Sequence, residues 1–320
     1  MLEQDPKSPE TKGAQKSEFV AKLEKRWEMG NFVCGGLDSD YDQLPHMKHV
    51  FVKDSIGSRM ANFNMEIIDA IHDLVCAYKL NIAFYEAQGI EGWKALANTI
   101  EYIKEEHPDI PVILDAKRAD IGNTNLGYVK AAFDELGADA ITVHPYLGEE
   151  ALRPFLDRKD KGVFVLVKTS NPGAGEFQDL PINLKDIDDE YADKFEADDD
   201  ELRRVVGDFI VPFYQYMAFR VSRYWNDNGN VGVVVGATYP RELTRVRRIV
   251  GNIPILIPGI GAQGGEVERT VEAGQDSRGM GMIINSSRGI IFASKGPDFA
   301  EAARRETQKL HDSINQFRHS

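Results

Sequence analysis

The chain has 320 residues, of which 42% are hydrophobic and 28% charged, the balance of an ordinary globular protein with a substantial core. Its formal net charge of −13 argues against general nucleic-acid binding and against attraction to anionic membranes. No run approaches the ~18 apolar residues of a membrane span, and the first residues lack the apolar core of a signal peptide. We therefore expect a soluble, cytoplasmic protein, with Cys34 and Cys76 as buried free thiols because both lie in apolar stretches.

The pattern along the chain predicts a disordered N-terminal tail followed by one domain. Residues 1–17 are polar and rich in Lys, Glu, Ser and Pro, which is typical of a disordered segment. From residue 18 to residue 320, short apolar runs alternate with longer stretches of helical apolar spacing. The predicted strands are Phe32–Leu37, Ala77–Ala83, Val112–Ala116, Ala140–Val143, Val163–Lys168, Val231–Val235, Ile255–Pro258 and Met282–Ser286. The predicted helices are Glu91–Glu106, Thr124–Leu136, Leu202–Asn226, Arg241–Val250, Glu266–Ala273 and Pro297–Phe317.

Strands that alternate with helices predict an α/β fold, here a single (β/α)8 TIM barrel over residues 18–320. A doubly wound open sheet is the competing fold, but its usual G-x-G-x-x-G after the first strand is absent. Residues 173–200 interrupt the regular pattern and carry acidic runs at 186–190 and 198–200. We interpret this stretch as a long, solvated, acidic βα loop after strand five and not as a second domain.

Charged residues fall where the first three predicted strands end. Asp38 follows strand one, Lys79 lies late in strand two, and Asp115 and Lys117 share one face of strand three, with Asp120 in the turn beyond. Taken alone, a D-x-K-x-x-D pattern is equally consistent with a structural ion-pair network at a strand end. Because neighbouring strands of a barrel lie about 4.8 Å apart, the five groups form a row of alternating charge that packing does not readily explain. The row is therefore the candidate catalytic site.

The second half of the chain predicts an anion site. Glycine-rich Pro258–Gly265 follows strand seven and Arg288 follows strand eight, which is the corner where barrels often bind phosphate. A tight turn would also explain the glycines, but the nearby forked cation favours phosphate binding. At the end of strand five, Ser170 is a candidate to contact a polar ring edge, although a turn or cap role for Ser170 or Asn171 is comparably consistent with the sequence. His144, at the end of strand four, is interpreted as a structural or rim residue.

Five motifs resemble the orotidine 5′-phosphate decarboxylase family, in its longer bacterial-type branch. They are D-A-K-R-A-D-I-G-N-T at 115–124, Y-K-L-N at 78–81, K-T-S-N-P-G-A at 168–174, V-G-A-T-Y-P at 235–240 and P-G-I-G-A-Q-G-G at 258–265. The resemblance extends from Phe32 to Ala293 and keeps the order and spacing of the motifs. It implies a homodimer of (β/α)8 barrels that decarboxylates orotidine 5′-monophosphate to UMP, the last step of de novo pyrimidine nucleotide synthesis, without cofactor or metal.

The resemblance also implies roles for individual residues. Lys117, Asp115, Asp120 and Lys79 are the implied catalytic residues, with Lys117 donating the proton to C6 and Asp115 facing the substrate carboxyl group. Lys79 and Asp38 are implied to hold the ribose. The other implied substrate contacts are Asp120, Ile121 and Thr124 reaching into the partner subunit's site, Ser170 on the pyrimidine, and Gln263 and Arg288 on the phosphate under a closing loop that begins at Pro258.

The sequence departs from the family pattern at three uncharged positions. Leu80 and Ser39 stand where Pro is usual, and His144 stands where Asn is usual, so loop rigidity and rim contacts are in question. Two other functions remain open. Mg²⁺-dependent sugar-phosphate decarboxylases and aldolases of the same barrel type share D-x-K-x-x-D but need an acidic residue where Lys79 stands. A non-catalytic nucleotide-binding barrel would be expected to have lost part of the charged row, and no member is missing.

Overall fold

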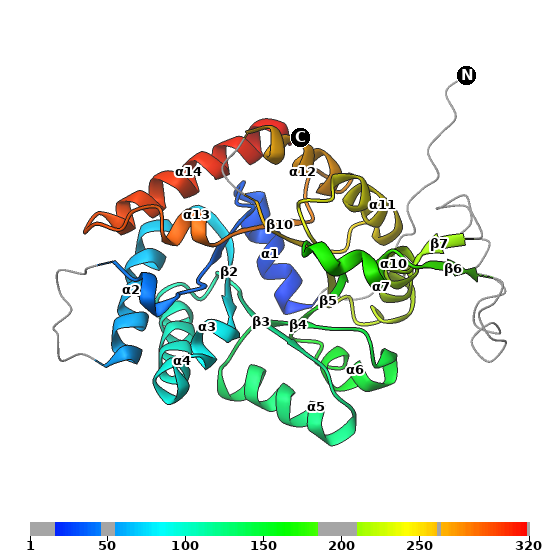
Figure 1. Ribbon diagram of the computed structural model, residues 1–320, viewed down its shortest axis with the longest axis horizontal. Helices are drawn as coiled ribbons and strands as arrows, with labels where there is room; N and C mark the ends of the chain where they lie inside the picture. The colour runs from blue at the N-terminus through cyan, green and yellow to red at the C-terminus, as the bar shows by residue number, and fades with distance from the viewer. Residues whose placement is uncertain (1–16, 46–54, 185–209, 261–263, 319–320) are drawn as a thin grey trace.

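The computed structural model describes residues 17–45, 55–184, 210–260 and 264–318. Eight parallel strands form a closed barrel in the order β1-β10-β9-β8-β5-β4-β3-β2, with helices around the outside (Figure 1). The barrel strands are β1 Val33–Gly36, β2 Val75–Asn81, β3 Val112–Arg118, β4 Ala140–Val143, β5 Gly162–Lys168, β8 Val231–Val235, β9 Ile255–Pro258 and β10 Met282–Ser286. The predicted (β/α)8 barrel is confirmed, and four of its strands, β4, β8, β9 and β10, have the predicted bounds.

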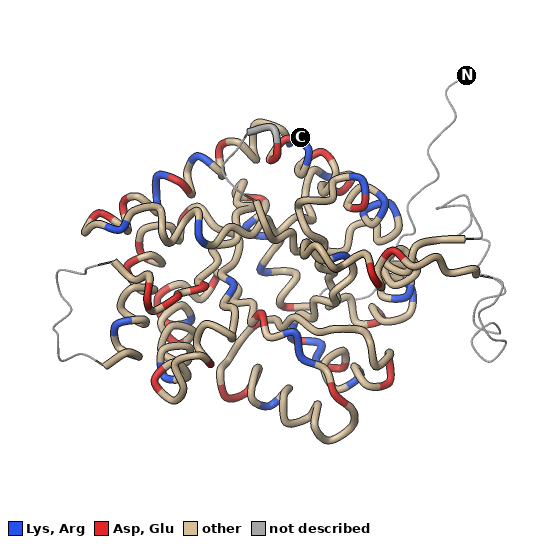
Figure 2. The backbone as a smooth tube through the Cα atoms, in the orientation of Figure 1, with Lys and Arg blue, Asp and Glu red and all other residues tan. Residues whose placement is uncertain are grey.

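The helices surround the barrel, and residues of both charge signs are distributed along them (Figure 2). The α-helices are α1 Glu18–Glu28, α2 Ile56–Ile71, α3 Ile82–Glu86, α4 Gly89–Glu106, α5 Gly122–Val129, α6 Gly148–Leu156, α7 Gly175–Gln178, α10 Phe213–Tyr224, α11 Pro240–Val250, α12 Gly264–Gly274, α13 Arg288–Ile291 and α14 Phe299–Phe317. Shorter elements are the 3₁₀ turns η1 Tyr41–Gln43 and η3 Pro172–Ala174 and the π-helical turn η2 Lys130–Glu135, which continues α5. None of the helices in the described ranges is long and apolar enough to cross a membrane.

Helix α1 packs against the amino-terminal end of the barrel, and the sequence patterns did not reveal it. Ser17, the last residue of the predicted tail, is buried and accepts the backbone N–H of Val20 as the N-cap of this helix. The ring of Phe19 meets Phe164 of β5 edge to face at 5.7 Å, and Arg26 donates to the carbonyl of Val75 at the start of β2. These contacts join α1 to strands on two sides of the barrel. Helix α1 therefore covers the amino-terminal end of the barrel, opposite the carboxyl ends of the strands.

The segment after β5 is more structured than a simple loop. β6 Pro181–Asn183 and β7 Ile210–Pro212 pair antiparallel and project from the barrel as a separate two-stranded sheet (Figure 1). The acidic runs and the first part of the helix predicted at 202–226 lie outside the described residues. Helix α10 begins at Phe213, directly after its N-cap Pro212, because a proline disfavours helical backbone at the residue before it and so keeps Val211 extended.

The carboxyl ends of the strands form the mouth of the barrel. Strand β2 ends at Asn81, two residues before the predicted end, because the Asn81 side chain accepts the N–H of Ala83 and starts α3. Below the mouth, the barrel and its contacts with the helices form one continuous apolar core. Cys34 and Cys76 are buried free thiols, as predicted.

Candidate active site

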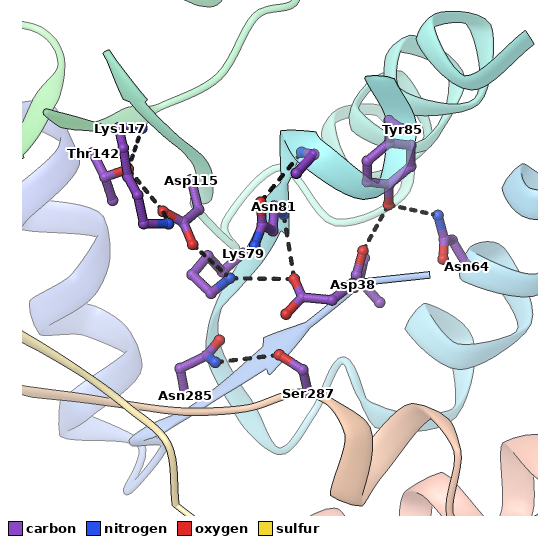
Figure 3. A network of polar contacts seen from close by, with 12 residues as sticks. Asp38, Asn64, Lys79, Asn81, Tyr85, Asp115, Lys117, Thr142, Asn285 and Ser287 are labelled. Atoms are coloured by element: carbon purple, nitrogen blue, oxygen red, sulfur yellow. Dashed lines mark hydrogen bonds and ion pairs between the residues drawn. The ribbon is translucent and has the colours of Figure 1, made fainter. Parts of the chain in front are cut away.

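Four charged side chains meet at the ends of β1, β2 and β3 (Figure 3). Lys79 Nζ lies 3.3 Å from Asp38 Oδ1 and 3.1 Å from Asp115 Oδ2, and Lys117 Nζ lies 2.7 Å from Asp115 Oδ1. The alternation predicted from the strand ends is therefore present as a continuous chain of ion pairs, Asp38–Lys79–Asp115–Lys117. We call these four residues the charged row.

Burial and neighbouring charges act in opposite directions on the pKa values of Asp115 and Lys79. Burial by itself would raise the pKa of Asp115, but the ammonium groups of Lys79 and Lys117 outweigh it and lower that pKa to about 2. Burial would lower the pKa of Lys79, but Asp115 and Asp38 outweigh it and raise that pKa above its ordinary value. The side chains of Lys79 and Asp115 are only 4% and 12% exposed, whereas that of Lys117 is 48% exposed. Asp115 and Lys79 are therefore both ionised at neutral pH, and Lys117 is the solvent-facing end of the row.

Lys117 is held in an unusual backbone conformation by a residue that sequence reasoning missed. Its φ of 48° is the only positive value among non-glycine residues in the described part of the chain. The Lys117 backbone N–H donates to Thr142 Oγ1 at 3.0 Å, and the same hydroxyl donates to Asp115 Oδ1 at 2.8 Å. Through these two hydrogen bonds, Thr142 of β4 contacts both Lys117 and Asp115 of β3. The strand register shifts between Leu114 and Arg118, and such irregularities re-aim side chains beside functional sites.

Asp120, Ile121 and Thr124 lie beyond the row. Asp120 Oδ1 accepts the N–H of Ile121 at 2.7 Å, and the Asp120 N–H donates to Asn125 Oδ1 at 2.9 Å. Within the described residues no ion pair joins Asp120 to a lysine of the row. Ile121 is 61% exposed and Thr124 is also exposed, and Gly122 makes the bend between them with a φ of 49°. Asp120 is half-buried, and the side chains of Ile121 and Thr124 are accessible to solvent in the single subunit.

The described residues of the predicted anion site lie at the ends of β9 and β10. Pro258 is half-buried at the end of β9, Arg288 is exposed at the start of α13, and Gln263 lies outside the described residues. Asn285, which sequence reasoning did not single out, is 5% exposed at the mouth and faces the row (Figure 3). Its Nδ2 donates to Ser287 Oγ at 3.3 Å, and its buried Oδ1 has no hydrogen-bond partner among the described residues.

The segment that carries Ser170 is tied to the end of β5. Lys168 is 1% exposed, lies 2.5 Å from Asp179 Oδ1 and sits 4.9 Å from the ring centroid of Tyr239. Ser170 itself is exposed, and a side chain on Gly236 would approach its Cβ to 2.7 Å. The end of β5 and the residues after β8 are therefore closely packed, which leaves Ser170 on the rim of the mouth.

A closed (β/α)8 barrel with ion-paired lysines and aspartates at its mouth is typical of the barrel enzymes, whose active sites lie at the carboxyl ends of the strands. Among the residues the structure describes, no group of three or more His, Cys, Asp or Glu is arranged to hold a metal ion.

Comparison with known proteins places the chain within that class. A family model described as "Orotidine 5'-phosphate decarboxylase / HUMPS family" matches residues 54–305. The chain is 43% identical to an orotidine 5′-phosphate decarboxylase of Cupriavidus necator over 302 residues, covering 94% of this chain and 99% of that protein. It is 46% identical to one of Thermomicrobium roseum over 289 residues, covering 90% and 91%. The solved structure of Leishmania donovani OMP decarboxylase matches with a TM-score of 0.71 and 34% identity, covering 92% of this chain and 98% of that one. The chain belongs to the orotidine 5′-phosphate decarboxylase / HUMPS family.

Proposed function

We propose that the charged row is the site at which this chain decarboxylates orotidine 5′-monophosphate to UMP and CO₂, in de novo pyrimidine nucleotide synthesis, and that Lys117 protonates C6. The observation that carries the proposal is the continuous chain of contacts from Asp38 through Lys79 and Asp115 to Lys117. It supports the residue roles that the family resemblance implies.

The chemistry requires both a positive charge and a proton at one point. When the C6–carboxylate bond breaks, CO₂ leaves and the electron pair stays on C6, where no ring position accepts it. An ammonium group stabilises that charge and then transfers a proton to C6, becoming a neutral amine. Lys117 is suited to this step because it is the exposed end of the row and can regain a proton from water. Asp115 lies 2.7 Å from it and would face the carboxylate that departs.

Remote groups of the substrate would bind around the row. We assign the ribose to Asp38 and Lys79, the pyrimidine to Ser170, and the phosphate to Arg288 with the loop that starts at Pro258. Gln263, which lies outside the described residues, belongs to the same phosphate assignment by resemblance. Arg288 supports this assignment because it is exposed and makes no ion pair with another described residue.

We further propose a homodimer in which Asp120, Ile121 and Thr124 complete the active site of the partner subunit. The exposure of Ile121 and Thr124 in the single subunit supports this arrangement. Large apolar side chains also gather on the same side of the molecule, on α5 and the segment before α6: Leu126 is 55% exposed and Tyr146 is 86% exposed. A second copy of the chain would cover them. We also propose a cytoplasmic location, where the buried thiols of Cys34 and Cys76 would remain reduced.

The two alternatives make different demands on the row. A Mg²⁺-dependent sugar-phosphate enzyme of this family would need oxygen ligands where Asp38 and Asp115 converge, but the Lys79 ammonium lies between them. A non-catalytic nucleotide-binding barrel would not require Lys117 to keep a left-handed backbone beside Asp115.

One assay separates these functions. Purified protein is incubated with orotidine 5′-monophosphate in excess EDTA, and CO₂ release is measured for wild type and for Lys117→Ala. We expect full turnover by wild type in EDTA and none by the variant, which should still bind UMP. Activity lost in EDTA and restored by Mg²⁺ would indicate the metal-dependent function, and UMP binding without turnover by wild type would indicate the non-catalytic one.

A further inference from the structure

A buried polar network is hydrogen-bonded to the two residues that flank Asp38 in sequence, Leu37 and Ser39. It joins the segment after β1 to α2, α3 and α4 through Ser39, Asn64, Tyr85 and Thr99, all of which are 0% exposed. Ser39 Oγ donates to Asn64 Oδ1 at 2.5 Å, and Asn64 Nδ2 donates to Tyr85 Oη and to Thr99 Oγ1, both at 3.0 Å. Figure 3 shows Asn64 and Tyr85 meeting to one side of Asp38.

The network has one arrangement that satisfies every member. Tyr85 donates its hydroxyl proton to the carbonyl of Leu37 at 2.8 Å, and Thr99 donates its own to the carbonyl of Ala95 at 2.7 Å. Both hydroxyls must therefore accept from Asn64, so the amide nitrogen of Asn64 faces them and its oxygen faces Ser39. A fully buried and fully satisfied network of this kind restricts motion, because any displacement leaves a buried polar group unpaired.

The network holds the backbone on both sides of Asp38. Leu37 precedes Asp38 and is fixed by Tyr85, while Ser39 follows it and is fixed by Asn64. Among the described residues, the Asp38 carboxylate makes two long hydrogen bonds, with Lys79 Nζ and the N–H of Asn81, each at 3.3 Å. Hydrogen bonds of that length position a side chain weakly. The place of the carboxylate is consequently set by its backbone more than by its partners at the mouth.

We propose that Tyr85 and Asn64 are positioning residues that fix Asp38 against Lys79 and so set the geometry of the row. This rests on the proposed role of Asp38 in substrate binding. It also assigns a purpose to Ser39, which stands where the family pattern has proline: its hydroxyl anchors the segment through Asn64, and this replaces the restraint of a rigid ring.

The test is Tyr85→Phe, which removes one hydroxyl and preserves the ring. The matched control is Tyr78→Phe, because Tyr78 is also 0% exposed and also donates to a helix carbonyl, that of Ile68 at 3.1 Å, but is hydrogen-bonded to neither Leu37 nor Ser39. Since one hydrogen bond is worth about 1 kcal/mol, Tyr85→Phe should lower kcat/KM about three- to tenfold. Tyr78→Phe should lower the urea midpoint similarly and leave kcat/KM unchanged. Equal kcat/KM in the two variants would overturn the proposal.

A double-mutant cycle separates positioning from general structural damage. In an Asp38→Asn background, Tyr85→Phe should cause no further loss of kcat/KM, because it acts through Asp38. An independent, additive loss would overturn the positioning role while leaving the proposed function intact. Full activity of Asp38→Asn alone would instead overturn the substrate-binding role of Asp38, and this inference with it. Ser39→Ala, which releases the other side of Asp38, should repeat the effect of Tyr85→Phe.

Discussion

The backbone of Lys117 makes a prediction about stability that is separate from its chemistry. Its φ of 48° lies in the left-handed region, which costs an L-residue about 1–2 kcal/mol relative to glycine. Glycine loses about 0.4–1 kcal/mol of that advantage through its greater freedom in the unfolded chain. Lys117→Gly should therefore be roughly 0.5–1 kcal/mol more stable than Lys117→Ala. The ion pair with Asp115 is lost in both variants and cancels from the comparison.

The assay is urea unfolding of both variants, with the same pair of substitutions at Lys94 as the control. Lys94 is exposed within α4 and pairs with Glu91 at 2.7 Å, so it likewise loses one surface ion pair in each variant. At an ordinary helical position glycine is about 1 kcal/mol less stable than alanine. The order of stability should therefore be opposite at residues 94 and 117.

Two results would refute the reasoning about Lys117. If glycine is the less stable substitution at residue 117 as well, the left-handed conformation is not an intrinsic cost at that position. If Lys117→Ala keeps more than about a hundredth of the wild-type kcat, a general acid worth ~10²–10⁴-fold cannot be assigned to Lys117. Confirmation of both parts would mean that the protein maintains backbone strain at the residue that donates the proton.

Three further predictions follow from the site. Asp115 has its pKa lowered to about 2, so it stabilises the fold above its unfolded pKa of about 3.9 and loses that effect as the pH falls. The difference in unfolding free energy between wild type and Asp115→Asn should shrink by about 1 kcal/mol between about pH 5 and about pH 3, and a constant difference would contradict the lowered pKa. Arg288→Ala should reduce kcat/KM about 10- to 150-fold for the nucleotide and much less for the nucleoside, whereas equal losses would make Arg288 structural. Mixing Asp120→Ala with Lys117→Ala after subunit exchange should restore up to about a quarter of wild-type activity if the site is shared, and no recovery would place both residues in one barrel.

The sequence was sufficient to predict those parts of the site that depend on the order of the strands. Lys79 and Asp115 could be placed together because carboxyl ends of parallel strands meet at one mouth, and their ion pair at 3.1 Å confirms it. Thr142 could not be found this way, since its double contact arises from a local shift in register between β3 and β4. The same holds for Tyr85, whose bond to Leu37 spans 48 residues and depends on how α3 packs behind β1. The periodicity of a strand shows which side chains share one face of it. It does not show where a bulge or a buried side-chain network forms.

The free energies available from charge repulsion and proton donation are too small to explain the whole acceleration, so the rest of the substrate must take part in catalysis. A decarboxylation that leaves a carbanion without an electron sink requires on the order of 20 kcal/mol of acceleration. Repulsion between Asp115 and a substrate carboxylate at ~4 Å supplies only about 4 kcal/mol at an effective dielectric of ~20, and the two lysines already screen Asp115. Proton donation adds a further ~10²–10⁴-fold, or about 3–5 kcal/mol. More than half of the acceleration is then left for binding energy from the phosphate and ribose, used to hold C6 against Lys117 in a dry site. Arg288, which is not a member of the charged row, would on this argument affect kcat as well as KM.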